Sequence, residues 1–167
     1  MYFEKISFEQ WEKDFIKIFP MATKEQIKES YNNIRLPETS TSSSAGHDFF
    51  LPFGGKWYNQ QDNFTIPTGI RWVPETEFDK NTVMLICPRS GWGTKFGMKL
   101  INTIGVIDSD YYLAKNEGHI MAIISVDTTF DTFSGDKFMQ GIIVPFVRCG
   151  KASNKQRTGG FGSTDKE

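Results

Sequence analysis

Short apolar runs separated by glycine, proline, serine and aspartate are the feature that most constrains this fold. From residue 34 onward the chain contains the runs DFFLPF, FTIPTGIRWV, TVMLICP, GHIMAIISV and GIIVPFV. Runs of this length, closed by turn-forming residues, are typical of β-strands. The pattern predicts an all-β domain of many short strands over residues 34–150.

Residues 1–33 have a different pattern, which predicts a helical extension. Ser7 and Gln10 have the spacing of a capping box at the start of a helix. The apolar side chains that follow recur at helical spacing on one face: Phe8, Trp11, Phe15, Ile18 and Phe19. We therefore expect an amphipathic helix over residues 7–19.

A second, shorter helix is expected after Pro20, which ends the first one. Thr23 and Gln26 form another capping box, and this helix should extend to about Tyr31. The aromatic stripe of the first helix has two interpretations. It either packs on the core of the β domain or contacts another subunit or a protein partner.

The nearly balanced charge excludes several function classes. With 19 basic and 20 acidic residues the formal net charge is −1, so no global positive field would hold the chain on nucleic acid or an anionic membrane. The apolar runs are too short to span a bilayer, and the N-terminus carries acids where a signal peptide needs basic and then apolar residues. We expect a single-domain cytosolic protein that binds neither nucleic acid nor membrane.

Cysteine and histidine are too few for a disulfide framework or a zinc site. The chain has the cysteines Cys87 and Cys149, and the histidines His47 and His119, without ligand spacing. We expect the two cysteines to be free thiols.

The segment Pro88-Arg89-Ser90-Gly91 is suited to holding a phosphate. A guanidinium offers a fork for phosphate oxygens, a hydroxyl adds a donor, and glycine lets backbone amides approach an anion. An ordinary turn has the same composition, so both interpretations remain open.

The segment NTIGVIDSDYY, residues 102–112, places acids directly after a predicted strand. An acid at a strand end, such as Asp108, can orient and deprotonate a water molecule. Asn102 can present both a donor and an acceptor to the edge of a base. Asp-Ser-Asp is also common in turns, and a turn without chemistry is the alternative.

Three further segments bear on the site. Within GDKFMQ, residues 135–140, only Gln140 invites a chemical role, and the polar stretch 38–44 is expected to be an ordered loop because it leads directly into a strand. Residues 151–167 are rich in glycine, serine, threonine and charge and are expected to form a flexible arm. Such an arm could close over a nucleotide and stack Phe161 on its base, or it could simply be a disordered tail.

Taken in order, SSSAGHDFF, PRSGWGTKFG, NTIGVIDSDYY, GDKFMQ and RTGGFGST resemble the five sequence motifs of the trimeric dUTPases. The resemblance covers residues 42–164. It implies a jelly-roll (β-clip) protomer and a homotrimer whose three active sites each use elements of all three chains. It also implies hydrolysis of dUTP to dUMP and pyrophosphate, with Mg²⁺ bound across the triphosphate.

The resemblance also implies a role for individual residues. Asp108 resembles the acid that activates water for attack on the α-phosphorus, and Asp48 the acid that supports the metal–water and phosphate region. Asn102 and the backbone that follows it at Gly105 would read uracil, and Tyr111 would lie against the deoxyribose. The residues implied to hold the phosphates or to close over the nucleotide are Arg89, Ser90, Gly91, Gln140, Arg157, Phe161, Gly162, Ser163 and Thr164.

The chain departs from the family pattern in four places. Residues 112–117 intervene before Gly118, so the expected base-reading hairpin is longer than usual. Arg157 precedes Phe161 by four positions, where the family usually has five. Lys137 stands where the family commonly has arginine, and the helical extension has no counterpart in the minimal fold.

Two other functions fit parts of the sequence. A dCTP deaminase shares the fold and a similar phosphate segment but deaminates cytosine with a glutamate, whereas here the corresponding position is Asp108. A dUTPase-fold regulatory protein could bind a protein partner through the N-terminal helices or through residues 112–117.

Overall fold

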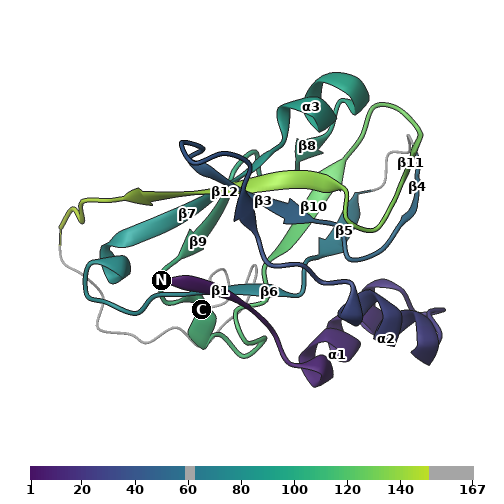
Figure 1. Ribbon diagram of the computed structural model, residues 1–167, viewed down its shortest axis with the longest axis horizontal. Coiled ribbons are helices and arrows are strands. Elements are labelled where there is room, and N and C mark those ends of the chain that lie inside the picture. The colour runs from purple at the N-terminus through teal and green to yellow at the C-terminus, as the bar shows by residue number, and fades with distance from the viewer. Residues whose placement is uncertain (59–62, 151–167) are drawn as a thin grey trace.

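A five-stranded antiparallel sheet forms the centre of the computed structural model, which describes residues 1–58 and 63–150 (Figure 1). Its strands lie in the order β2, β3, β12, β7, β9. Their bounds are Glu38–Thr39 for β2, Gly46–Phe50 for β3, Lys137–Pro145 for β12, Thr82–Pro88 for β7 and Gly105–Asp108 for β9. The long strand β12 therefore pairs with β3 on one side and with β7 on the other.

The described residues also form three smaller antiparallel sheets. Strand β10 lies between β5 and β8, β1 pairs with β6, and β11 pairs with β4. The bounds are Tyr2–Lys5 for β1, Gly55–Trp57 for β4, Phe64–Pro67 for β5, Ile70–Val73 for β6, Lys99–Leu100 for β8, Met121–Ser125 for β10 and Phe130–Thr132 for β11. The prediction of a mainly β domain of short strands is confirmed.

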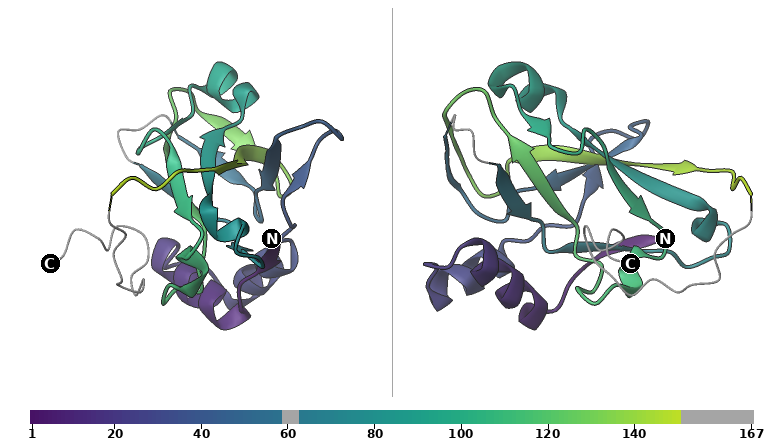
Figure 2. Two further views of the ribbon diagram at one scale, coloured as in Figure 1. Left: turned by 90° about the vertical axis from the view of Figure 1, so that its left-hand side faces the viewer. Right: turned by 180° about the vertical axis from the view of Figure 1, so that it is seen from behind.

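In the part of the chain that the structure describes, three α-helices flank the sheets, with α1 and α2 at one end of the β structure and α3 at the other (Figures 1 and 2). Helices α1, Phe8–Ile18, and α2, Lys24–Asn32, agree with the predicted helices. Helix α3, Ser90–Phe96, was not expected, because its glycines favour a turn. Two 3₁₀ turns, η1 at Asp79–Asn81 and η2 at Tyr111–Leu113, add short helical segments. In the described ranges no helix is long and apolar enough to cross a membrane.

The aromatic stripe of α1 packs on the protein's own core. Trp11 and Phe15 are almost completely buried, and the Trp11 indole N–H donates to the carbonyl of Ile27 on α2 at 3.2 Å. Phe15 also contacts Phe53 edge to face, with ring centroids 5.5 Å apart. Burying a large apolar side chain stabilises a fold by about 1.5–3 kcal/mol. Of the two interpretations of the stripe, core packing is therefore correct for these side chains.

The first residues of the chain form a strand that the sequence did not predict. Strand β1 pairs with β6, with Tyr2 opposite Val73 and Lys5 opposite Ile70. The N-terminal ammonium also forms a 2.5 Å ion pair with Glu75. The predicted helical extension, residues 1–33, is thus joined to the β structure by a strand as well as by the packing of α1.

Candidate active site

The register of the five-stranded sheet brings three of the predicted residues together. Gln140 on β12 lies opposite Asp48 of β3 on one side and opposite Cys87 of β7 on the other. Arg89 directly follows β7, and its backbone N–H donates to the carbonyl of Phe138 at 3.0 Å. Asp48, Arg89 and Gln140 come from different parts of the sequence and meet because β12 is the central strand between β3 and β7.

Asp48 is the centre of a charged cluster, which we call the Asp48 cluster: Ser40, Asp48, Arg89 and Lys137. The Asp48 carboxylate forms ion pairs with the Arg89 guanidinium and, at 3.0 Å, with the Lys137 ammonium. It also accepts a 2.6 Å hydrogen bond from the Ser40 hydroxyl. The Asp48 side chain is buried, whereas Arg89 and Lys137 are each about one third exposed. The cluster thus presents two cations to solvent above one buried anion.

The environment of Asp48 favours its ionised form. Burial by itself would raise the pKa of this carboxyl, because it removes the charge from water. The hydrogen bonds from Ser40, Lys137 and Arg89 outweigh burial and lower the pKa below its ordinary value. Asp48 is therefore a carboxylate at neutral pH, and it fixes the two cations in place.

Gly46 makes room for the Gln140 side chain beside this cluster. A Cβ at position 46 would collide with the side-chain amide of Gln140, and these two residues are close because Gly46 lies two residues from Asp48 on β3, on the same face of the strand. The glycine of the first motif thus has a packing role.

Ser90 and Gly91 lie next to the Asp48 cluster at the start of α3. Both are exposed, and Arg89 is the residue that precedes the helix. Gly91 has open space where a side chain would be. The predicted phosphate segment is therefore a strand-to-helix junction that is open to solvent, and it is not an ordinary turn.

Asp108 lies at the end of β9, in a different part of the sheet. It pairs with Val83, the second residue of β7, and its side chain is exposed. The following residue is held in place, because the Ser109 hydroxyl donates to the carbonyl of Lys80 at 3.0 Å. Asp108 is therefore a solvent-accessible acid at a strand end, as the sequence predicted.

Asn102 begins a tight turn that leads into β9. The Ile104 N–H donates to the Asn102 carbonyl at 2.7 Å, and Thr103 between them has a φ of 66°. A positive φ is uncommon outside glycine, and it is more costly still for a β-branched residue. Gly105, which follows, packs so closely on Ile86 that a Cβ would not fit.

The expected base-reading hairpin differs from a simple β-hairpin. Among the described strands, β9 pairs with β7 and β10 pairs with β5 and β8, so β9 and β10 belong to different sheets. A cavity of only about 10 Å³ lies between them, with Asn102, Gly105 and Ala122 in its lining. The connection, residues 109–120, contains the 3₁₀ turn η2; we call it the 109–120 loop. The 112–117 insertion lies within this loop.

Tyr111 lies inside this loop and is almost completely buried. Its hydroxyl donates to the carbonyl of His119 at 3.1 Å and accepts a hydrogen bond from the Asn116 side chain at 3.1 Å. The Tyr111 hydroxyl is thus held by Asn116 of the insertion and by His119, which follows it.

The two groups of predicted residues lie at opposite ends of β7. Asp108 is opposite Val83, and Arg89 follows Pro88, the last residue of the strand. Because a strand advances about 3.3 Å per residue, Val83 and Arg89 are roughly 20 Å apart. Within one protomer, therefore, Asp108 and the Asp48 cluster do not face a common small site.

Sequence reasoning missed two members of the Asp48 cluster. Ser40 lies in the stretch 38–44, which the sequence predicts to be an ordered loop, and Lys137 departs from the family pattern at a position to which the sequence assigns no role. The signal for Ser40 was weak, because the contact with Asp48 depends on the pairing of β2 with β3. The predicted arm residues lie outside the described ranges: Arg157, Phe161, Gly162, Ser163 and Thr164.

A further cavity of the described chain lies elsewhere, between α1, α2 and β4. Its volume is about 780 Å³, and its lining includes Phe15, Phe19, Phe53 and Trp57. It contains none of the predicted site residues. We place the candidate active site at the Asp48 cluster and the Asp108 end of β9, because the predicted residues Asp48, Arg89 and Asp108 lie there.

The described residues contain no group of three or more histidine, cysteine, aspartate or glutamate side chains that could hold a metal ion. Cys87 and Cys149 are free. Asp48, the one buried carboxylate of the Asp48 cluster, is already paired with two cations.

Comparison with known proteins decides the family. No protein-family model matches the chain. The deoxyuridine 5'-triphosphate nucleotidohydrolase (dUTPase) of Lactococcus lactis subsp. lactis (strain IL1403) is 33% identical to the chain over 154 residues, which cover 83% of this chain and 95% of the relative. The chain belongs to the dUTPase family.

Solved dUTPase structures agree in fold. A crystal structure of the dUTPase from Streptococcus mutans has a TM-score of 0.64 at 28% identity and covers 90% of this chain and 100% of that chain. The dUTPase from phage phi11 of S. aureus has a TM-score of 0.55 at 23% identity and covers 78% of this chain and 93% of that chain. The second likeness shows the fold alone. The Asp48 cluster and the Asp108 end of β9 are accordingly the candidate active-site elements of a dUTPase.

Proposed function

We propose that the protein hydrolyses dUTP to dUMP and pyrophosphate as a homotrimer with three active sites. Membership of the dUTPase family supports the reaction. The proposal that each active site uses residues of more than one copy rests on one observation. Asp108 and Arg89 are roughly 20 Å apart along β7. This separation supports a site in which the Asp48 cluster of one copy holds the triphosphate and Asp108 of a second copy lies beside the attacked phosphorus.

The reaction begins with a water molecule beside Asp108. The carboxylate accepts a proton from this water as its oxygen attacks the α-phosphorus, and the bond from that phosphorus to the bridging oxygen of the β-phosphate breaks. Pyrophosphate leaves and dUMP remains. The exposed position of Asp108 at a strand end gives the water access to the carboxylate.

Arg89, Ser90, Gly91 and Gln140 are proposed to hold the phosphates. Arg89 supplies a charged fork, Ser90 a hydroxyl, and Gly91 an unobstructed backbone. Asp48 positions Arg89 and Lys137 before substrate binds, so that little rearrangement is needed to meet the triphosphate.

The side chains of the Asp48 cluster, with one carboxylate among them, fit a Mg²⁺ ion that is held mainly by the phosphates of the substrate. Mg²⁺ usually keeps several waters and binds through substrate phosphates plus one or two carboxylates, so a three-residue ligand cluster is not required. Asp48 would support such an ion through water. When bound, the ion supplies neutralisation of charge on the phosphates. A structure of the phage phi11 dUTPase is described as containing a structural Mg(II) ion.

Uracil is proposed to lie beside the Asn102 turn, where β9 and β10 belong to different sheets. The Asn102 amide and the backbone near Gly105 would meet its hydrogen-bonding edge, and a cytosine would present the reverse pattern at its amino group. Tyr111 would back the deoxyribose. The C-terminal arm would then bring Arg157, Phe161, Gly162, Ser163 and Thr164 over the nucleotide.

The function is tested by pyrophosphate release from dUTP, dCTP, dTTP and UTP at equal concentrations with Mg²⁺. We expect release from dUTP to exceed release from the other three by at least about tenfold. Ammonia release from dCTP is measured in parallel. Ammonia without pyrophosphate would show a deaminase, and no turnover of any nucleotide would contradict the proposal.

A further inference from the structure

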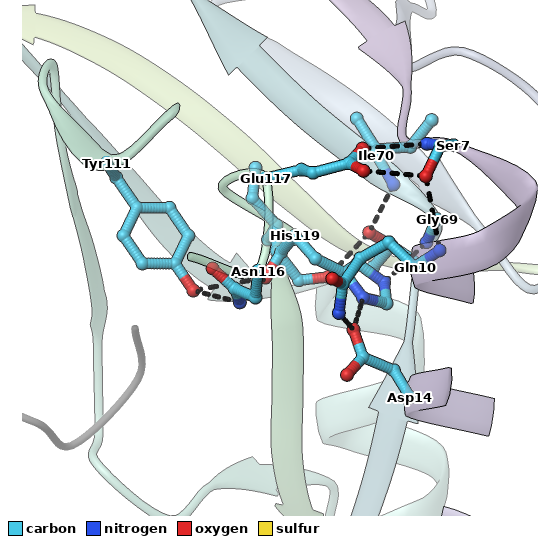
Figure 3. A network of polar contacts seen from close by, with 11 residues as sticks. Ser7, Gln10, Asp14, Gly69, Ile70, Tyr111, Asn116, Glu117 and His119 are labelled. Carbon is cyan, nitrogen blue, oxygen red and sulfur yellow. Dashed lines mark hydrogen bonds and ion pairs between the residues drawn. The ribbon is translucent and has the colours of Figure 1, made fainter. Parts of the chain in front are cut away.

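The N-terminal cap of α1 is completed by a residue from the 109–120 loop. In a capping box the third residue of the helix accepts a hydrogen bond from the cap's backbone N–H. Here the Gln10 side chain instead donates to Asp14 at 2.9 Å. Its place is taken by Glu117, which accepts from the Ser7 N–H at 2.8 Å and from the Ser7 hydroxyl at 2.6 Å (Figure 3).

Helix α2 provides an internal comparison. Its cap, Thr23, forms a complete and local capping box with Gln26. Both helices thus have a hydroxyl cap that accepts a hydrogen bond from a backbone N–H three residues later. They differ in the acceptor for the cap's own N–H, which is local in α2 and lies 110 residues away in α1.

Glu117 has an unusual backbone conformation for this role. Within the described ranges, Thr103 and Glu117 are the two residues other than glycine with a positive φ, and the φ of Glu117 is 58°. Gly118, which follows, has a φ of 72°. Glycine or asparagine would adopt this conformation more readily than glutamate. The glutamate side chain contributes the carboxylate that accepts both hydrogen bonds from Ser7.

A second contact joins the same loop to α1. The His119 side chain is completely buried, and its Nε2 accepts a hydrogen bond from the Gly69 N–H at 2.9 Å. The proton of the neutral ring is therefore on Nδ1, which donates to the Asp14 carboxylate at 2.7 Å (Figure 3). Asp14 lies two turns along α1 from Ser7, so the helix holds the loop at two points.

The anchored part of the loop is continuous with the candidate active site. The carbonyl of His119 and the side chain of Asn116 both bond the Tyr111 hydroxyl. Tyr111 stands three residues after Asp108. A displacement of Glu117 or His119 would therefore move the Tyr111 ring and the end of β9.

We propose that Ser7 and Asp14 of α1 are positioning residues for substrate recognition, because they hold the 109–120 loop through Glu117 and His119. This inference rests on the proposed function. In this chain the extra residues before Gly118 and the N-terminal helix form one unit, which sets the position of Tyr111 beside the nucleotide's sugar. The N-terminal helix thus contributes to specificity without contacting substrate.

The test compares Ser7→Ala with the matched control Thr23→Ala, because each removes a cap hydroxyl but only the first weakens the contact with Glu117. Steady-state kinetics on dUTP and UTP give KM and kcat separately for each. For Ser7→Ala we expect KM for dUTP to rise about tenfold and the preference for dUTP over UTP to fall by a similar factor. Thr23→Ala should leave both unchanged.

Further variants separate positioning from general stability. Ser7→Thr and Glu117→Gln keep hydrogen-bonding groups at both positions and should retain parental KM and preference. Glu117→Ala should resemble Ser7→Ala, and the double variant should be no worse than the more impaired single one. If Glu117→Ala does not fold, the KM values and nucleotide preferences of Ser7→Ala and Glu117→Gln still decide whether the proposal holds. Unchanged KM and preference in Ser7→Ala, or equal changes in Thr23→Ala, would overturn the proposal.

Failure of the proposed function gives a different result. If the parental protein releases no pyrophosphate from dUTP, the activity assignment is wrong, and amide hydrogen exchange decides the anchoring. Faster exchange of residues 111–120 in Ser7→Ala than in Thr23→Ala supports the anchoring. Equal exchange in the two variants overturns it.

Discussion

Asp108 and Arg89 lie at opposite ends of strand β7, since Asp108 pairs with Val83 near the start of the strand and Arg89 directly follows its last residue, Pro88. In the proposed trimer, one protomer carries the base of one site and the phosphate contact of another. In this arrangement an isolated protomer would not contain a complete site, so the proposed activity requires the assembled trimer.

Mixed trimers test this arrangement directly. Asp108→Asn and Arg89→Ala should each be inactive alone, but trimers assembled from an equal mixture should contain sites with an intact Asp108 from one copy and an intact Arg89 from another. For random assembly about a quarter of the sites recover. Pyrophosphate release is measured after joint refolding, with each variant refolded alone as the control. No recovery in trimers shown to be mixed would place both residues in one chain's site.

Replacement of Asp48 by asparagine should affect both stability and turnover. The change leaves Arg89 and Lys137 without their buried counter-charge, so we expect a loss of about 1–3 kcal/mol in the free energy of unfolding. Chemical denaturation measures it. Asp131→Asn, on the exposed face of β11, is a matched control that should change stability by less than about 0.5 kcal/mol. Equal effects of the two substitutions would contradict the role of Asp48 as the centre of its cluster.

Acid should weaken the fold through carboxylates that are stabilised as anions. For Asp14, Asp48 and Glu117 burial opposes ionisation, but hydrogen bonds from His119, Ser40 and Ser7 respectively contribute to a lowered pKa. A lowered folded-state pKa gives stability that is fully present above the ordinary values, 3.8 for aspartate and 4.5 for glutamate. That stability is lost as pH falls through the lowered pKa values.

The melting temperature as a function of pH measures this effect. The contribution of these groups should be constant from about pH 7 to 5 and should fall below about pH 4. Asp48→Asn should show a shallower acid decline than the parental protein. A melting temperature that rises on acidification from pH 5 to 3 would contradict the assigned ionisation states.

Removal of residues 155–167 should reduce turnover far more than folding. The deleted segment contains the proposed lid residues, including Phe161 and Ser163, and we expect a loss of about tenfold or more in kcat/KM for dUTP. The melting temperature should change little. A truncated protein that hydrolyses dUTP at the parental rate would show that the arm is not a lid.

The sequence was sufficient for the β-rich fold and for both N-terminal helices, because turn residues, apolar spacing and capping boxes are local signals. It also identified Asp48, Arg89 and Gln140, and the structure places Asp48 and Gln140 in adjacent strands and Arg89 directly after the neighbouring strand β7. For Pro88-Arg89-Ser90-Gly91 the alternative of an ordinary turn was wrong, because a short helix begins at Ser90 despite its glycines.

Other features depend on contacts between distant residues, which no local pattern contains. Ser40 reaches Asp48 only because β2 pairs with β3. Glu117 looked like part of an unexplained insertion, and His119 like an isolated histidine. Their roles become clear only when α1 packs beside the loop and brings Ser7 and Asp14 to them.

The central claim is that Asp108 activates the attacking water, and Asp108→Asn tests it most directly. Pyrophosphate release from saturating dUTP with Mg²⁺ should fall by about 10²–10⁴-fold, because an amide cannot accept the proton. Oligomeric state and nucleotide affinity, measured on the same preparation, should remain close to parental values. Turnover within about twofold of the parental rate would show that Asp108 is not the base.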